Sequence, residues 1–148
     1  MTELVARNPE YRQVTEQVFL AAPFVQSLGI ELLDLGPGWC HARMVITERH
    51  CQQHGYVHAG AQATLADHTA GAAAGTLVAI DETVLTVEFK INLLRPADSE
   101  ELYCEGRVIR PGKRFSVVES SVWADALGGE RLVSKAQLTM AVVTSIVN

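Results

Sequence analysis

The chain has 148 residues, 48% hydrophobic and 20% charged, which is the composition of one soluble domain able to bury a core without disulfides or a structural metal. Twelve Lys and Arg residues against seventeen Asp and Glu residues give a net charge of -5, so the overall field repels nucleic acid and anionic membranes. The longest apolar run, Thr69–Ile80, is about half of the roughly 20 residues that a membrane-spanning helix needs. Polar residues also occupy the N-terminal stretch where a signal peptide is apolar. We therefore expect a single domain over residues 1–148, with a cytoplasmic location and with neither nucleic acid nor membrane as a partner.

The first third of the chain is predicted to form a helix and a hairpin. Apolar residues at near-helical spacing predict a helix over residues 9–21, which Pro23 separates from a short second turn. Two apolar-rich segments, Ile30–Leu35 and Trp39–Ile46, flank a Gly-Pro-Gly turn and predict a β-hairpin. The polar, glycine-containing stretch Thr47–Val57 is interpreted as a loop, where functional residues are often found.

The next segment, His58–Ala79, has no proline and is dominated by alanine, which predicts a helix of about 20 residues, roughly 30 Å long. It has few Lys and Glu residues, and small residues along it would let another backbone approach, so we expect it to be buried. Four strand-like runs follow, separated by turns that contain Pro or Gly: Thr83–Leu94, Glu101–Arg110, Arg114–Ala126 and Arg131–Val143. This order of elements predicts an α+β fold with an antiparallel six-stranded sheet wrapped around a long central helix.

The cysteines and the missing motifs disfavour several chemistries. Cys40, Cys51 and Cys104 are odd in number and widely spaced, so we interpret them as reduced, small apolar residues rather than as a disulfide framework. No GxGxxG, Walker or Gly-x-Ser-x-Gly segment occurs, which argues against dinucleotide binding, nucleotide hydrolysis and serine hydrolase chemistry.

The most informative motif lies where the polar loop meets the long helix. It consists of Gln52, Gly55, the run His-Ala-Gly that ends at Gly60, and a Leu-Ala-Asp run that ends at Asp67. A polar amide, a glycine, His-(Gly/Ala)-Gly at a helix start and Leu-Ala-Asp two turns on resemble the signature of hotdog-fold acyl-CoA thioesterases of the phenylacetate-degradation (PaaI-like) type. The predicted order of elements is also that of a hotdog domain, so the resemblance spans nearly the whole chain. Dehydratases of the same fold carry Asp-x-Asn-Pro-x-His or His-Phe-Pro segments, which this sequence lacks.

The resemblance implies a role for individual residues. Asp67 matches the carboxylate that activates the hydrolytic water or attacks the thioester. Ala59 stands where the family usually has Gly, whose backbone N–H binds the thioester oxygen, and Gln52 stands where it usually has Asn, which helps to hold the nucleophile or the carbonyl. Thr86 matches the Ser or Thr that hydrogen-bonds the water, and His58 opens the helix beside the oxyanion site.

Physical chemistry also makes the start of this helix suitable for a developing negative charge. The first N–H groups of a helix lack intrahelical acceptors and lie at the positive end of its dipole, so those of His58, Ala59 and Gly60 form an oxyanion hole without side chains. The small side chains of Ala59 and Gly60 would let a thioester reach these donors.

The spacing of the motif predicts an oligomer. Asp67 lies nine residues beyond His58, roughly 13 Å along the helix axis, so it cannot reach a carbonyl bound at the start of its own helix. Two such helices running antiparallel across a two-fold axis would bring Asp67 of one chain to the helix start of the other. We therefore expect a homodimer as a requirement of the mechanism, assembled further into a homotetramer.

Each candidate residue also has a purely structural interpretation. A helical Asp usually faces solvent or caps a helix, although the apolar neighbours of Asp67 mean that its burial needs a reason. His58 could simply cap the helix, and Thr86 is a good strand residue in any protein. Alternation along the third strand puts Thr86 on a polar face with Glu88, Lys90 and Asn92, opposite an apolar face of Leu85, Val87, Phe89, Ile91 and Leu93.

His50, His54 and His58 recur every four residues, a spacing that could hold a metal on one face of a helix. Gly55 and the polar loop composition argue against a helix there, and no Cys or carboxylate completes a ligand set. We expect no metal and no other cofactor.

A CoA ester would need cations for its phosphates. Arg95 at a strand end, and Arg110, Lys113 and Arg114 around the Pro-Gly turn, form the only local cationic cluster, and we take Gly60, Arg95, Lys113 and Arg114 as substrate-binding candidates. The alternative is that these cations are simply solvated.

Two functions therefore follow. The first is an acyl-CoA thioesterase that releases a free acid and CoA, and the second is a non-catalytic hotdog module that binds acyl-CoA, which the departures at Gln52 and Ala59 favour. A hydratase of the same fold is disfavoured because its motif is absent.

Overall fold

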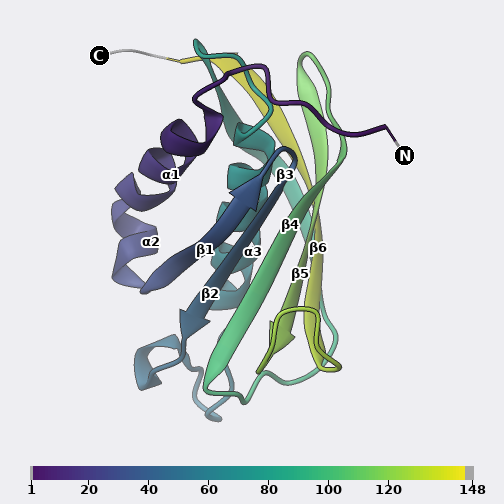
Figure 1. The fold of residues 1–148 in the computed structure, drawn as a ribbon. Helices are drawn as coiled ribbons and strands as arrows, with labels where there is room; N and C mark the ends of the chain where they lie inside the picture. The colour runs from purple at the N-terminus through teal and green to yellow at the C-terminus, as the bar shows by residue number, and fades with distance from the viewer. Residues whose placement is uncertain (1, 146–148) are drawn as a thin grey trace.

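Two short helices and a β-hairpin precede the long helix, and four further strands follow it (Figure 1). The computed structural model describes residues 2–145; Met1 and residues 146–148 of the predicted domain lie outside the described residues. The elements in chain order are α1 (Tyr11–Ala21), α2 (Pro23–Ser27), β1 (Ile30–Gly36), β2 (Trp39–Val45), the 3-10 helix η1 (Glu48–His50), α3 (Ala59–Gly75), β3 (Glu82–Leu93), β4 (Glu101–Arg110), β5 (Phe115–Ala124) and β6 (Leu132–Thr144). The predicted order of helices and strands is confirmed.

The long helix differs from its prediction at both ends. It begins at Ala59, with His58 as its N-cap, and ends at Gly75 rather than Ala79. The hydroxyl of Thr76, the next residue, donates to the Ala73 carbonyl and accepts from the N–H of Gly38 in the β1–β2 turn. This bridge to the hairpin fixes the end of the helix, and the chain then turns to enter β3.

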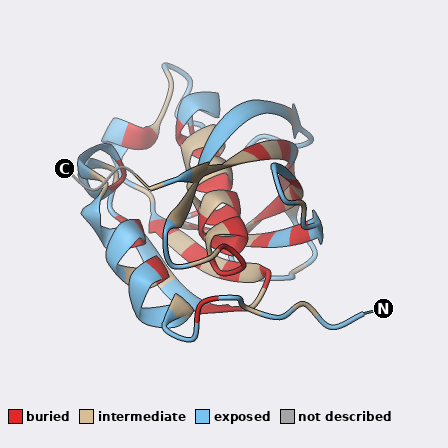
Figure 2. Cartoon of the chain, turned by 90° about the horizontal axis from the view of Figure 1, so that it is seen from above, coloured by how far each residue is buried: buried red, intermediate tan, exposed pale blue. Residues whose placement is uncertain are grey.

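The six strands form one antiparallel sheet in the order β1-β2-β4-β5-β6-β3, which leaves β1 and β3 as edge strands. Seen from above, the sheet curls around α3, whose residues are mostly buried or half-buried, while α1 is mostly exposed at the rim (Figure 2). This is the predicted hotdog arrangement, and it is confirmed.

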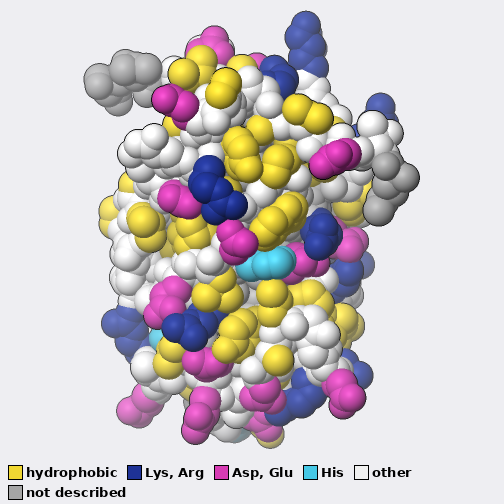
Figure 3. Space-filling model, in the orientation of Figure 1, with side chains coloured by type: hydrophobic (Ala, Val, Ile, Leu, Met, Phe, Trp, Pro, Cys, Tyr) yellow, Lys and Arg dark blue, Asp and Glu magenta, His cyan; other side chains and the backbone are white. Residues whose placement is uncertain are grey.

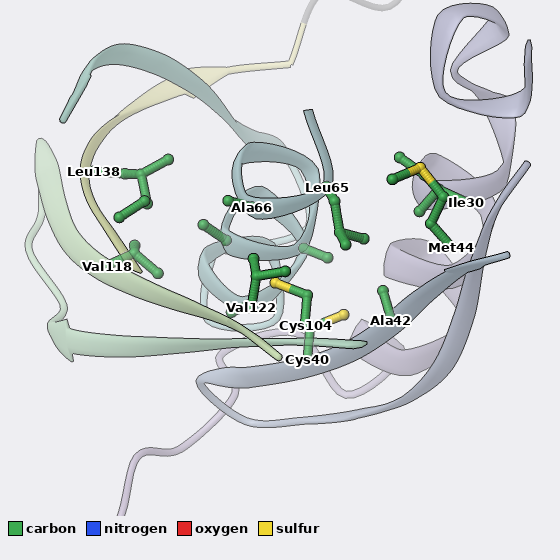
Figure 4. Packing of buried hydrophobic residues seen from close by; sticks show 14 of the residues in the cluster. Ile30, Cys40, Ala42, Met44, Leu65, Ala66, Cys104, Val118, Val122 and Leu138 are labelled. Carbon is green, nitrogen blue, oxygen red and sulfur yellow. The ribbon is translucent and has the colours of Figure 1, made fainter. Parts of the chain in front are cut away.

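The core lies between the concave face of the sheet and α3 (Figure 4). Leu65 is fully buried there, and burying such a side chain contributes about 1.5–3 kcal/mol. β4 approaches the helix so closely at Gly106 that a Cβ there would lie 2.8 Å from the Thr69 carbonyl oxygen. Cys40 and Cys104 are fully buried in this layer, whereas Cys51, which we interpreted in the same way, is only half-buried. Burial raises the pKa of the Cys104 thiol to about 12. The alanines and glycines of α3 and β4 therefore allow the sheet to close around the helix.

Among residues 2–145, no helix combines the length and the hydrophobicity that crossing a bilayer requires.

Candidate active site

The structure brings Asp67 and Thr86 together. Asp67 is half-buried in the middle of α3, and the Thr86 hydroxyl on β3 donates a hydrogen bond of 2.7 Å to its Oδ1. Thr86 Oγ1 also lies 3.2 Å from the sulfur of Met140 on β6. One carboxylate oxygen of Asp67 is thereby held in place, while Oδ2 accepts no hydrogen bond from residues 2–145.

A β-bulge in β3 explains this contact and corrects the predicted alternation. The register with β6 shifts between Thr86 and Glu88, so that Thr86 lies opposite the buried Met140 and Glu88 lies opposite Thr139. Directly opposed residues share a face, so the extra residue at Val87 moves Thr86 to the helix side together with Phe89. The prediction that Thr86 shares a face with Glu88, Lys90 and Asn92 is wrong, because strict alternation assumes an unbroken pleat.

A cleft of about 510 Å³ opens beside Asp67. It lies between α1, α3 and β3, and most of its lining is apolar: Val14, Val18, Phe19, Ala21, Ala22, Gly71, Ala72, Gly75, Val78, Val84, Leu85 and Met140, with Thr15, Asp67, His68, Glu82, Thr83 and Thr86 as the polar members. A cavity of this size and character, with a few convergent polar groups, is typical of a small-molecule site.

The start of α3 offers fewer free donors than expected. The N–H of His58 donates to the His50 carbonyl at 2.8 Å, and the N–H of Gly60 donates to His58 Nδ1 at 2.8 Å. Ala59 is exposed, and its N–H donates to no acceptor among the described residues. Of the three N–H groups predicted to form the oxyanion hole, only that of Ala59 is left, and Ala59 is the residue that the resemblance points to. His58 instead caps the helix.

A second cleft, of about 540 Å³, lies at this helix start. It brings together Gln52, His58, Ala59 and Arg95, four of the predicted site residues. The side-chain oxygen of Gln52 accepts the N–H of His54 and so closes its own loop, and Arg95 donates to the Leu132 carbonyl at 2.8 Å. Gln52 thus shapes the loop that borders the cleft.

Gln62 and His68 are two polar side chains of these clefts that the sequence reasoning missed. Gln62 is 3% exposed in the second cleft; its Nε2 donates to the Val57 carbonyl, and its Oε1 has no partner among the described residues. His68 borders the first cleft and ties α3 to α1 through a 3.0 Å bond to the Phe19 carbonyl. A polar residue on the inner face of an alanine-rich helix was the available signal for Gln62.

The two halves of the predicted site are separate within one chain. Ala59 lies in the cleft at the helix start, whereas Asp67 lies in the other cleft, eight residues or about 12 Å further along α3. Lys113 and Arg114 lie in the β4–β5 turn, at the end of the molecule opposite to the helix start (Figure 1). The structure does not bring these two cations to Ala59 or Arg95 of the same chain.

Two cations of the sheet, Arg43 and Arg107, are already paired with carboxylates. Lys and Arg side chains lie beside Asp and Glu side chains across the face in Figure 3. Arg43 binds Glu31 at 2.8 Å and Arg107 binds Glu105 at 2.8 Å on this sheet.

The histidine spacing has a structural explanation. His50 is buried, its Nδ1 accepts the N–H of Thr47, and its Nε2 donates to the Leu28 carbonyl. His58 Nδ1 accepts the N–H of Gly60. His50 therefore stabilises the loop and His58 caps the helix.

Comparisons with known proteins agree on one family. The sequence profile of the thioesterase superfamily matches residues 54–131. A thioesterase family protein from Silicibacter pomeroyi is 32% identical, covers 91% of this chain and 99% of its own, and superposes with a TM-score of 0.87. A 1,4-dihydroxy-2-naphthoyl-CoA hydrolase of Listeria monocytogenes is 27% identical over 79% of this chain and 93% of its own. The PaaI protein of the Escherichia coli phenylacetic acid degradation operon is 17% identical, covers 97% of this chain and all of its own, and shares the fold with a TM-score of 0.84.

Proposed function

Because this chain belongs to the thioesterase superfamily, we propose that it hydrolyses the thioester of an acyl-CoA to a free acid and CoA, with Asp67 as the reactive carboxylate. The observation that carries the proposal is the hydrogen bond between Asp67 and Thr86, two residues that line an apolar cleft. A carboxylate held by one hydroxyl and facing an apolar cavity fits the hydrolysis of an ester that has a polar carbonyl and an apolar tail.

The complete site is formed by two chains. Asp67 and the free N–H of Ala59 are about 12 Å apart in one chain, so the oxyanion donor for each Asp67 is Ala59 of the partner subunit. The edge strand β3 supplies the surface for this dimer, since it pairs with no described strand on one side and exposes Leu85, Val87, Phe89 and Leu93. An apolar, unpaired edge strand is suited to pair with a second copy of itself.

The reaction then follows from these groups. Asp67 either takes a proton from a water whose oxygen attacks the carbonyl carbon, or attacks that carbon itself and is released by water in a second step. In both routes the carbonyl electrons move to the oxygen, where the Ala59 N–H and the helix dipole of the partner subunit stabilise the charge. The C–S bond then breaks and the CoA thiolate leaves, taking up a proton.

CoA itself lies along the second cleft in this proposal. Arg95 borders that cleft beside Ala59. In a dimer with antiparallel α3 helices, the β4–β5 turn of one chain lies near the start of α3 of the other chain. Lys113 and Arg114 of the partner subunit can therefore contact the phosphates of CoA.

The test is a thiol-trapping assay over a panel of acyl-CoA thioesters. Asp67→Asn keeps the side-chain volume and removes the proton acceptor, so turnover should fall by about 10²–10⁴-fold. A folded Asp67→Asn protein with wild-type turnover would remove Asp67 from the mechanism. Binding of acyl-CoA without thiol release would instead identify the chain as a non-catalytic acyl-CoA-binding module.

A further inference from the structure

One face of α3 carries a stripe that begins at the proposed reactive carboxylate. Asp67, Gly71 and Gly75 follow each other at four-residue spacing and are all half-buried, whereas the opposite face of the helix is fully buried. All three residues line the cleft of about 510 Å³. Gly71 lies about 6 Å and Gly75 about 12 Å beyond Asp67 along the helix axis.

The missing side chains of the two glycines leave open space in this cleft. A Cβ built on Gly71 would meet no atom within 4 Å, and one on Gly75 would only touch Thr15 at 4.0 Å. Neither glycine has the positive φ that would require glycine for backbone reasons. Facing walls are apolar, with Val14 and Val18 from α1 and Val84 from β3. The space therefore does not serve the packing of this chain on itself.

A charged side chain lies at the far end of the cleft. Glu82 lines it there, accepts the N–H of Ala79 at 2.9 Å and forms an ion pair with Arg7, which also donates to the Leu77 carbonyl at 3.1 Å. The Ala79 N–H and Arg7 lower the pKa of Glu82, so this end stays charged at neutral pH. The apolar stretch of the cleft thus runs between the carboxylates of Asp67 and Glu82.

We infer that this cleft holds an apolar acyl group of the substrate and that Gly71 and Gly75 determine the acyl length accepted. The inference rests on the proposed function, since it takes the thioester carbon to lie at Asp67. An acyl chain that starts there passes Gly71 first and Gly75 second before it meets Glu82. Gly71 and Gly75 are specificity-determining residues in this scheme and take no part in the chemistry.

The experiment measures kcat/KM for acetyl-, butanoyl-, hexanoyl-, octanoyl- and decanoyl-CoA with the wild type, Gly71→Val, Gly75→Val and the control Gln17→Val, an exposed α1 position outside the cleft. For the wild type, kcat/KM should rise with acyl chain length, because each methylene that enters an apolar site should raise it about fourfold. Gly71→Val should have the wild-type kcat/KM for acetyl-CoA but no further rise in kcat/KM from hexanoyl-CoA onward. Gly75→Val should lose this rise only for the longest thioesters. Gln17→Val should match the wild type throughout.

Two results would overturn the inference while the proposed function stands. One is that Gly71→Val lowers kcat/KM equally for all chain lengths, and the other is that it changes none of them. If the wild type hydrolyses no thioester, the proposed function fails, and calorimetry with the thioether analogue of decanoyl-CoA then tests the cleft alone. If Gly71→Val binds that analogue as tightly as the wild type, the cleft does not hold the acyl group. Weaker binding by Gly71→Val together with unchanged binding by Gln17→Val would support the inference. Thermal unfolding of each variant confirms that the protein is folded.

Discussion

At the scale of single residues, the proposed site depends on which polar groups the hydrogen bonds of the chain occupy. Thr86 occupies Oδ1 of Asp67, and His58 occupies the N–H of Gly60. Among residues 2–145, the groups left without a partner at the site are Oδ2 of Asp67 in one cleft, and the N–H of Ala59 and Oε1 of Gln62 in the other. In the proposed mechanism, Oδ2 of Asp67 and the N–H of Ala59 are the groups that act on the substrate.

Thr86 can be tested by removing its hydroxyl alone. Thr86→Val keeps the shape and should lower kcat about 10- to 100-fold, because a hydrogen bond to a charged group contributes about 1.5–3 kcal/mol, and Thr86→Ser should restore most of the activity. Thr139→Val is a matched control, because the Thr139 hydroxyl also donates to a carboxylate. Its acceptor is Glu88, at 2.8 Å, and not Asp67. Steady-state kinetics on one acyl-CoA decide the case; equal activity of the Thr86→Val and Thr139→Val variants would contradict the role.

At the scale of elements, strand pairing places ionisable groups in register. His41 on β2 lies opposite Glu105 on β4, with 2.7 Å between His41 Nε2 and Glu105 Oε2, and Arg107 binds the other oxygen at 2.8 Å. Burial acts to raise the pKa of Glu105, but the hydrogen bonds from Arg107 and His41 outweigh it and hold the pKa below its usual range. The ionised carboxyl therefore stabilises the folded sheet.

This lowered pKa predicts a pH dependence with a definite sign. The contribution of Glu105 is present above the unfolded-state pKa, about 4.3, and is lost as the pH falls through the lower folded-state pKa. Glu105→Gln should be less stable than the wild type at pH 7, and the difference in free energy of unfolding should shrink below about pH 4. Urea denaturation at several pH values measures it, with Glu130→Gln, an exposed carboxyl between β5 and β6, as the control. A difference that stays constant down to pH 3 would contradict the assignment.

At the scale of the whole molecule, the proposed function requires a second copy of the chain. An Asp67→Asn chain mixed with a Gly60→Trp chain should regain about a quarter of wild-type activity, because half of the dimers are mixed and each has one intact site. Each variant alone should be inactive. Lack of rescue after demonstrated subunit exchange would count against the shared site, and light scattering on the same samples tests the predicted homodimer and homotetramer.

The β4–β5 turn belongs to the same scale, since its cations would serve the site of the other chain. Changing Lys113 and Arg114 together to Ala should raise KM for acyl-CoA, leave kcat nearly unchanged and spare a short thioester without the nucleotide, because ground-state binding is what is lost. Added salt should weaken the wild type more than the double variant. Lys135→Ala is the control, because its ammonium is already bound to Glu119 at 2.7 Å. Equal losses on both substrates would assign the turn to the fold and redirect the search to Arg95 or Arg110.

The sequence by itself determined the order of the elements, the buried small-residue helix and the family, because periodicity, turn residues and a spaced motif are local properties of a chain. Those predictions are confirmed. The end of α3 at Gly75 and the bulge that turns Thr86 toward Asp67 were decided only by tertiary structure, since they depend on Gly38 and Met140, far away in sequence. The cleft beside Gly71 likewise exists only because α1 and β3 pack on opposite sides of one helix stripe. Local patterns set which residues are available, and contacts between distant segments set which of them meet.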